Sequence, residues 1–428
     1  MPHLQTGFHP KLLSAWRTGD VAGAIKHDAL AGLTVAVVAL PLSMAIAIAS
    51  HVAPERGLFS AIVGGFIISA FGGSRFQVGG PAGAFIVLVA ALVDAKGLGG
   101  LMTAMVMAGI ILILVGISGL GKFIRFVPLP VVLGFSAGIA IIIAASQIKD
   151  VFGLSLTGAE PAPIIEKLSA LWAAHYSFNA VALGFAAFTF VMIEVLRKYK
   201  PMWPGLLVAV VICSLLAALH PGMVETIASK YGGIPSSLPV PTMPDLSFAS
   251  MLSLLPAAFS FALLAGIESL LSALVADGMT GRKHRSSTEL MAQGLANVVT
   301  AFFGGIVCTG LIARTATNIR AGARTPLAGI LHSVFILAFM LVAAPLAGYI
   351  PLAALAGVLV SVCWHMADKA QIGQMLRDNK KAALVMLVAF GLTVFVDLTT
   401  GILASTALAF VLSPKDFLRG PQADATPH

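Results

Sequence analysis

Hydrophobic residues follow one another in long runs along this chain, and few polar positions interrupt them. A helix needs about 20 apolar residues to cross ~30 Å of hydrocarbon, so most of these runs have the length of membrane-spanning segments. The pattern predicts an all-α polytopic membrane protein with fourteen segments. They lie at residues 29–50, 58–72, 76–93, 100–120, 123–146, 178–196, 203–219, 251–276, 289–303, 308–319, 326–348, 350–366, 382–397 and 399–413.

The composition agrees with a membrane protein, since 58% of residues are hydrophobic and only 10% are charged. In a soluble globular domain about a quarter of the residues are charged. The three cysteines, Cys213, Cys308 and Cys363, fit neither a disulfide framework nor a zinc site. The Cys363 and His365 pair is interpreted as packing. We therefore expect no metal and no cofactor.

The basic residues sort by membrane side when the fourteen segments are placed in order. Twenty of the 26 lysines and arginines fall in connections on the side of the N-terminus, five fall on the other side, and Arg314 lies inside a segment. The positive-inside rule then predicts that both termini are cytoplasmic. A net charge of +8 that is distributed in this way indicates a membrane topology and argues against a nucleic-acid partner.

Arg314 lies in a run, residues 303–325, that is too short and too rich in glycine to cross the bilayer as one helix. We interpret this run as an extended stretch that leads into a half-helix near the bilayer centre. A charge at that depth costs ~3 kcal/mol or more, so it predicts a functional site. The alternative is that Arg314 pairs with an acid and only locks two helices together.

Residues 76–93 form a second broken segment, in which an extended stretch and a Gly-Gly turn precede Pro81 at the first turn of a helix. Superposing the glycine pair 72–73 on the pair 304–305 places Ala82 opposite Arg314. Both residues are then expected at the start of a half-helix.

A further internal similarity indicates two related halves: VPLPVVLGFSAG at 127–138 resembles IPLAALAGVLV at 350–360. Seven segments in each half would make the second half inverted relative to the first. The predicted divisions are a cytoplasmic N-terminal segment (1–27), a first repeat (28–219), an extracellular linker (220–250), a second repeat (251–413) and a cytoplasmic tail (414–428).

Glu268 is the one acid placed at mid-depth, in the eighth segment. Ser272 follows at i+4 on the same helix face and is expected to add a hydroxyl to the same site. At the start of the ninth segment, Ser286 and Glu289 have the spacing of a capping box.

The sequence argues against an enzyme. Residues 134–138 spell G-x-S-x-G, but they lie in an apolar helical run with no strand or elbow, so we interpret them as small residues for helix packing. No H-E-x-x-H pattern and no P-loop occurs, which excludes their zinc-protease and ATP-driven chemistry.

Several of these stretches together resemble the sulfate permease (SulP) anion transporters, the relatives of pendrin and prestin. They are ALPLSMAIAIAS, GLFSAIVGGFI, FGGSRFQVGGPAGAF, GIESLLSALVADGMTGRKHRSSTELMAQGLANVVTAFFGG and IPLAALAGVLV, and the resemblance covers about residues 28–413. The first stretch has Leu42 and Ser43 where many members have Gln-Gly after the proline.

The resemblance implies a core domain and a gate domain, with an anion held between the half-helices of segments three and ten. Segments one and eight would complete the site, and Glu268 and Ser272 would be its acid and hydroxyl. The implied substrate-binding residues are Leu42, Ser43, Ile46, Pro81, Ala82, Gly83, Ala313, Arg314 and Thr315. It also implies a homodimer and a cytoplasmic STAS domain, for which this chain has no room after the last segment.

These residues predict a secondary active transporter in the cell inner membrane, which carries a small anion such as a dicarboxylate, sulfate or bicarbonate together with protons. A permanent acid beside the anion would repel it, and a proton carried by Glu268 would resolve this conflict. The alternatives are a sodium-coupled bicarbonate transporter, a nucleobase permease of related fold, and an uncoupled anion channel, exchanger or prestin-like motor.

Overall fold

The computed structural model describes residues 8–119, 128–158, 160–161, 163–201 and 203–412, and these are mostly helical, as predicted. Parts of the expected N-terminal segment (1–27) and the whole tail (414–428) lie outside the described residues. Seven helices within the described ranges are long and apolar enough to cross a membrane, and two more apolar helices are shorter. The chain is a multi-pass membrane protein.

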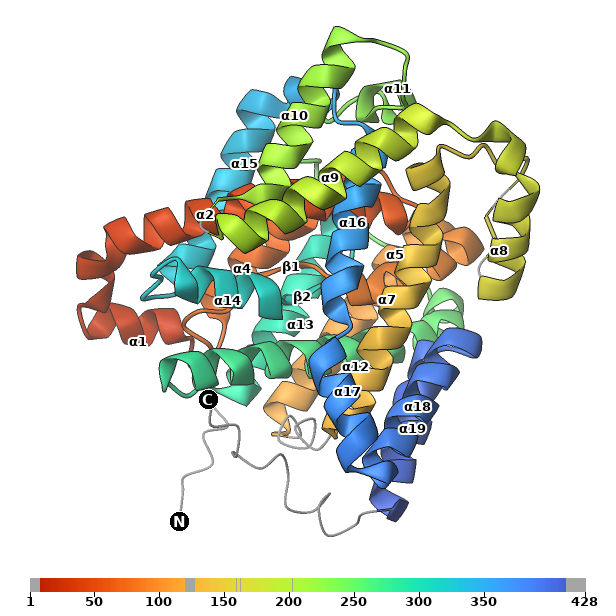
Figure 1. The fold of residues 1–428 in the computed structure, drawn as a ribbon. Coiled ribbons are helices and arrows are strands. Elements are labelled where there is room, and N and C mark those ends of the chain that lie inside the picture. The colour runs from red at the N-terminus through yellow and green to blue at the C-terminus, as the bar shows by residue number, and fades with distance from the viewer. Residues whose placement is uncertain (1–7, 120–127, 159, 162, 202, 413–428) are drawn as a thin grey trace.

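The helices pack into two groups, and both are visible in Figure 1. We call the first the strand-bearing bundle, because it encloses two short strands near the middle of the view. It consists of α2 (Asp20–Ala49), α3 (Pro54–Phe59), the π-helical turn η1 (Ser60–Gly64), α4 (Gly65–Phe71), β1 (Gly79–Pro81), the 3-10 turn η2 (Gly83–Phe85), α5 (Ile86–Ile117), α12 (Phe248–Thr280), α13 (Ser286–Phe302), β2 (Cys308–Gly310), α14 (Ile312–Arg320) and α15 (Leu327–Ala347).

The second bundle consists of α7 (Leu129–Phe152), α9 (Ala180–Tyr199), α10 (Gly205–Leu219), α16 (Leu352–Met366), α18 (Lys380–Phe395) and α19 (Leu398–Leu412). Short helices lie around the two bundles: α1 (Lys11–Arg17), α8 (Ile164–Ala173), η3 (His175–Ser177), α11 (Ile227–Tyr231) and α17 (Lys369–Asp378). The predicted connections contain α8 and α17, which the apolar pattern did not indicate.

Small residues let the helices of each bundle approach closely, as expected in a membrane. Between α5 and α13, a side chain on Gly109 would meet the carbonyl oxygen of Gly294 at 2.5 Å, and one on Gly294 would meet that of Gly109 at 2.4 Å. In α7, side chains on Gly134 and Gly138 would collide with α18. The G-x-S-x-G pattern is therefore a helix-packing surface, as predicted.

The linker 220–250 has more structure than a free connection. It contains α11, and the residue before this helix, Thr226, forms an isolated antiparallel bridge with Pro351 at the start of α16. The backbone N–H of Ile227 donates to the carbonyl of Ile350, and that of Leu352 donates to Glu225. The linker is thus joined to the second bundle by main-chain hydrogen bonds.

Candidate anion-binding site

Two broken segments meet in the middle of the strand-bearing bundle. Strands β1 and β2 pair antiparallel, with Gly79 opposite Gly310 and Pro81 opposite Cys308. Each strand is followed by one extended residue and then by helix: Ala82 precedes η2 and α5, and Leu311 precedes α14. The predicted breaks and extended stretches are therefore present in both segments.

The predicted superposition of Ala82 on Arg314 is wrong by three residues, because the position equivalent to Ala82 is Leu311. Five residues (74–78) separate the first glycine pair from β1, whereas only Ile306 and Val307 separate the second pair from β2. The glycine pairs are thus not in register, since the connection that follows each has its own length. Arg314 consequently lies in the first turn of α14 instead of at its cap.

Polar side chains satisfy the unwound backbone, which has no water partner in the interior of a membrane protein. Pro81 has no N–H to donate to Cys308, its partner in the strand pair. The side chain of Asn297 in α13 pairs with the backbone of Cys308 instead. Its Nδ2 donates to the carbonyl of Cys308 at 2.8 Å, and its Oδ1 accepts from the Cys308 N–H at 3.0 Å. Ser60 does the same for Ile306, accepting from its N–H at 2.7 Å and donating to its carbonyl at 2.9 Å.

Helix α14 is bound to the extended stretch before β1. The Oγ1 of Thr315 accepts from the N–H of Val78 at 3.2 Å and from the hydroxyl of Ser272 at 3.1 Å. One turn later, the Nδ2 of Asn318 donates to the carbonyl of Phe76 at 2.9 Å. Thr315 is buried, so its hydroxyl joins three segments and holds Arg314 in place through the helix they share.

Arg314 is 3% exposed, and its guanidinium lies between α2 and β1. Its Nη2 donates to the Oγ of Ser43 at 2.9 Å, while Nε and Nη1 have no hydrogen-bond partner among the described residues. A side chain on Gly80 would lie 2.3 Å from Nη1, so only glycine leaves room for the arginine there. Buried donors normally find acceptors, and two unpaired ones on a cation indicate a place for an anionic ligand.

The other residues expected near the substrate differ in their surroundings. Leu42, Ile46, Pro81 and Ala82 are buried or half-buried around the strand pair. Gly83 faces the second bundle, where a side chain on it would lie 3.7 Å from the Cδ1 of Ile143 and from the Sδ of Met366. Ala313 is exposed, on the side of α14 opposite to its buried neighbours. The site therefore has an interior part at Arg314 and an open part at the helix starts.

Glu268 is partly exposed and forms no ion pair with Arg314 in the part of the chain that the structure describes. The alternative in which the arginine only locks helices with an acid thus finds no contact in this structure. Ser272 is buried and donates to Thr315, so its hydroxyl stabilises α14.

His332 of α15 is a polar residue of this region that the sequence reasoning missed. It is fully buried, and neither ring nitrogen has a hydrogen-bond partner in the part of the chain that the structure describes. The neighbouring Ser333 donates to the carbonyl of Ala61, and the Cα of Ala61 lies 3.7 Å from the position that a Gly80 side chain would take beside Arg314. The available signal was an ionisable residue inside an apolar run, the same signal that identified Arg314.

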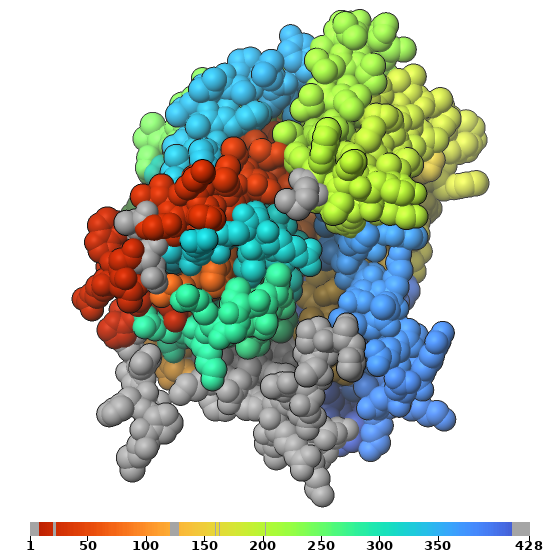
Figure 2. All heavy atoms as spheres, turned by 60° about the vertical axis from the view of Figure 1, so that its left-hand side comes forward, coloured from red at the N-terminus to blue at the C-terminus, as the bar shows by residue number. Residues whose placement is uncertain are grey.

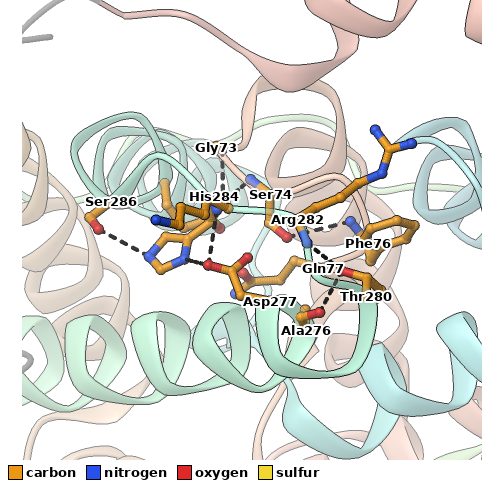
Figure 3. A network of polar contacts seen from close by, with 12 residues as sticks. Gly73, Ser74, Phe76, Gln77, Ala276, Asp277, Thr280, Arg282, His284 and Ser286 are labelled. Atoms are coloured by element: carbon orange, nitrogen blue, oxygen red, sulfur yellow. Dashed lines mark hydrogen bonds and ion pairs between the residues drawn. The ribbon is translucent and has the colours of Figure 1, made fainter. Parts of the chain in front are cut away.

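The predicted capping box at Ser286 is wrong. Helix α13 has Arg285 as its N-cap without a side-chain cap, and the Oε2 of Glu289 accepts from the N–H groups of Gly73 and Ser74 at 2.8 and 2.9 Å. Ser286 instead contacts the Nε2 of His284, whose Nδ1 lies 2.7 Å from Asp277 (Figure 3). The N–H groups of Gly73 and Ser74 are buried and must be paired, so they require the carboxylate more than an exposed helix start does.

A half-buried acid joins two helices of the second bundle. Glu194 of α9 precedes Arg197 by three residues, but its carboxylate accepts from the hydroxyl of Ser361 at 2.7 Å and lies 2.9 Å from the Nε2 of His365. Cys363 lies between these two residues of α16 and is buried. The histidine of the Cys363 and His365 pair therefore joins two helices of the second bundle.

A multi-pass membrane protein with paired broken segments and a buried arginine at a half-helix is the architecture of a membrane transporter. The chain belongs to the sulfate permease family, whose model, described as "Sulfate permease family", matches residues 25–389. It is 43% identical to "Putative sulfate transporter YvdB" of Bacillus subtilis over 393 residues, 90% of this chain and 73% of the relative. It is 32% identical to "Bicarbonate transporter BicA" of Picosynechococcus over 91% of this chain and 70% of the relative.

Solved structures agree with the family. The transmembrane domain of a cyanobacterial bicarbonate transporter, BicA, matches with a TM-score of 0.80 and 32% identity, over 88% of this chain and 97% of that one. SLC26A9 matches with a TM-score of 0.83 over 94% of this chain and 67% of that one, at 20% identity, which shows the likeness of fold alone. The resemblance found in the sequence is thus confirmed, and the relatives are transporters and not enzymes.

Proposed function

We propose that this chain is a secondary active transporter, which carries a small anion together with protons by alternating access. The anion is of the class of a dicarboxylate, sulfate or bicarbonate. The observation that supports this most is Arg314: a cation that is 3% exposed, in the first turn of a half-helix, with Nε and Nη1 unpartnered. An anion that accepts from both nitrogens would offset the cost of burying them.

The starts of the two half-helices complete the proposed site. The N–H groups of a first helical turn are free to donate, and the turn carries about half a positive charge. Helix α14 and the η2–α5 start face this region from the two strands. The proposed substrate-binding residues are Leu42, Ser43, Ile46, Pro81, Ala82, Gly83, Ala313, Arg314 and Thr315.

Glu268 is the proposed proton carrier, with Ser272 as the hydroxyl one turn further along α12. Glu268 has no basic partner among the described residues, so an ionised carboxylate would stand as an uncompensated charge near the anion. A proton that binds with the anion removes that charge.

The two bundles are the proposed moving parts, with the strand-bearing bundle as the core and the second bundle as the gate. Gly83 lies on the boundary between them, since a side chain there would lie 3.7 Å from atoms of Ile143 and Met366. In this proposal the fourteen segments form two inverted repeats, both termini are cytoplasmic, and the protein is a homodimer in the cell inner membrane.

Transport by purified protein in liposomes tests the proposal. A panel of anions is offered while an inward proton gradient and an inward sodium gradient are imposed separately. We expect accumulation of one anion class above equilibrium with the proton gradient alone. Equal flux with and without any gradient, with no uphill accumulation, would point to a channel, an exchanger or a prestin-like motor.

A sodium-coupled bicarbonate transporter is the second candidate, because two of the relatives are named bicarbonate transporters. In that case Glu268 would be an ionised cation ligand. Bicarbonate uptake that follows the sodium gradient and ignores the proton gradient would select this candidate.

Cysteine labelling tests the orientation. A cysteine introduced in the linker 220–250 is expected to react with an impermeant reagent from outside, and one near Arg282 from inside only. The three natural cysteines are buried, so they give a low background. Reaction of both introduced cysteines from the same face would contradict the arrangement of segments.

A further inference from the structure

A cavity of about 530 Å³ opens on the face where the predicted cytoplasmic connections meet. Three of its lining residues are arginines: Arg75, Arg282 and Arg324. Figure 2 shows this face, with the red start of α2, the cyan chain after α14 and the green end of α12 around orange residues of the 72–78 connection. The remaining lining residues are Gly19, Gly23, Ala24, Phe76, Thr280 and Ala323.

The cavity touches one end of each of the four segments that build the anion site. Ala24 belongs to α2, which carries Ser43, and Phe76 lies in the stretch that leads into β1. Thr280 ends α12, and Ala323 follows α14. Arg314 is not among the lining residues, so the cavity is separate from the candidate anion site.

The charge of the cavity is positive. Among the residues that the structure describes, Arg282 forms no ion pair with an acid, and its guanidinium extends away from Asp277 toward the side of Phe76 (Figure 3). The Nη2 of Arg324 lies 3.1 Å from the Nε2 of His27, a neutral partner when that nitrogen accepts. Among the described lining residues, none is acidic.

A neighbouring lysine responds to the same positive charge. The pKa of Lys11 is lowered by burial, then by the charges of Arg285 and Arg75, and to a smaller extent by Arg282. The excess of cations is therefore a property of this whole face and extends beyond the lining residues.

The walls of the cavity leave room for a ligand to approach closely. Side chains built on Gly19 and Gly23 would meet no atom within 4 Å. The volume is within the range of ~300–1,000 Å³ for small-molecule sites, and far larger than a single sulfate or bicarbonate needs. Arginines favour phosphate because their planar forks match two of its oxygens.

We propose that this cavity binds a phosphate-bearing ligand through Arg282 and Arg324, at a site separate from the transported anion. Two sources offer this chemistry: the headgroup of an anionic phospholipid and a soluble cytoplasmic phosphate compound. Because the ligand would contact all four segments, it would also hold the 76–78 stretch against α14, where Asn318 bonds the carbonyl of Phe76 at 2.9 Å.

Thermal unfolding of the purified protein with increasing inorganic pyrophosphate tests the proposal. We expect pyrophosphate to raise the Tm of the wild type, with binding about tenfold weaker in Arg282→Gln and in Arg324→Gln, and weaker still in the double variant. Arg377→Gln is the matched control, since Arg377 lies at the end of α17 and does not line the cavity. Arg314→Ala should bind pyrophosphate as the wild type does, which separates this site from the substrate site.

Two further measurements decide the source and the consequence. Stabilisation in nanodiscs that contain phosphatidic acid, lost in the Arg282 and Arg324 double variant, would assign the ligand as a lipid headgroup, whereas stabilisation by pyrophosphate alone would assign a soluble compound. Hydrogen exchange of residues 72–78 should slow on binding. Equal pyrophosphate binding by the wild type and the double variant, or its loss in Arg314→Ala alone, would overturn the proposal.

Discussion

The two broken segments have the same backbone plan and opposite chemistry. The first, from β1 to α5, carries no charge beside the strand and continues into α5, which the non-helical backbone of Gly97 (φ 66°, ψ −174°) divides into two helices. The second, from β2 to α14, ends in a helix of nine residues whose first turn holds Arg314. The first supplies space, through Gly80, and the second supplies charge. Two segments with similar backbones can therefore form one ligand site in which only the second segment carries the charge.

Removing the charge should have the largest effect. Arg314→Ala is expected to leave a folded protein that binds its anion about 100-fold more weakly or not at all, because two charged donors are lost. Arg314→Lys should recover part of the affinity, since it keeps the charge and loses the planar fork. Equilibrium binding with the transported anion measures both. A double variant, Arg314→Ala with Glu268→Gln, that regains normal transport would show that the pair is structural.

The acid of α12 should control coupling and not affinity. Glu268→Gln is expected to retain anion binding and exchange in liposomes but to lose stimulation by an inward proton gradient, because the amide takes up no proton. Uptake with and without the gradient measures this. Proton-driven accumulation at the wild-type level would remove Glu268 from the mechanism.

Filling the space of the first segment should have an intermediate effect. In Gly80→Ala the new methyl group would lie 2.3 Å from the Nη1 of Arg314, so the guanidinium must move. We expect anion affinity to fall about tenfold while the protein stays folded. Gly99→Ala is the control, since a side chain there meets nothing within 4 Å. Equal affinities in the two variants would show that Gly80 is not matched to the arginine.

The backbone support of the second segment is expected to matter for stability. Asn297→Leu leaves the N–H and carbonyl of Cys308 without their side-chain partner, at a cost of about 1–3 kcal/mol for each unsatisfied group. Thermal unfolding in detergent should show a clear decrease in Tm. The exposed Gln374→Leu on α17 should change the Tm little.

The entry to α12 should give the smallest effect. The pKa of Asp245 is lowered by hydrogen bonds from the hydroxyl of Ser250 and from the N–H and hydroxyl of Ser247. A carboxyl with a lowered pKa stabilises the fold above its ordinary titration range and loses this contribution as pH falls through the folded-state pKa. Asp245→Asn should therefore lower the Tm slightly at pH 7, and the two proteins should converge in Tm below about pH 4. A difference that grows as pH falls would contradict this assignment.

The apolar pattern predicted the long helices and both breaks, because a segment that crosses a membrane needs a long apolar run and any interruption of that run is costly. It did not predict the short helices α8 and α17. The same reasoning identified Arg314 from its position alone. It failed where several polar groups compete for one partner: Glu289 had a suitable helix start nearby but accepts from a buried turn across the bundle. The apolar pattern also could not predict the register of β1 and β2, because this register depends on the lengths of two connections that are far apart in the chain.

The pairing of Gly79 with Gly310 also limits which insertions and deletions the chain can tolerate during evolution. A residue added among 74–78 can be taken up by the connection, but one added within Gly79–Pro81 would turn every following side chain to the opposite face of the strand. Gly80 would then no longer lie under the guanidinium. Insertions inside one strand would thus survive only with a compensating change in the other, so we expect the lengths of these two stretches to be inherited together.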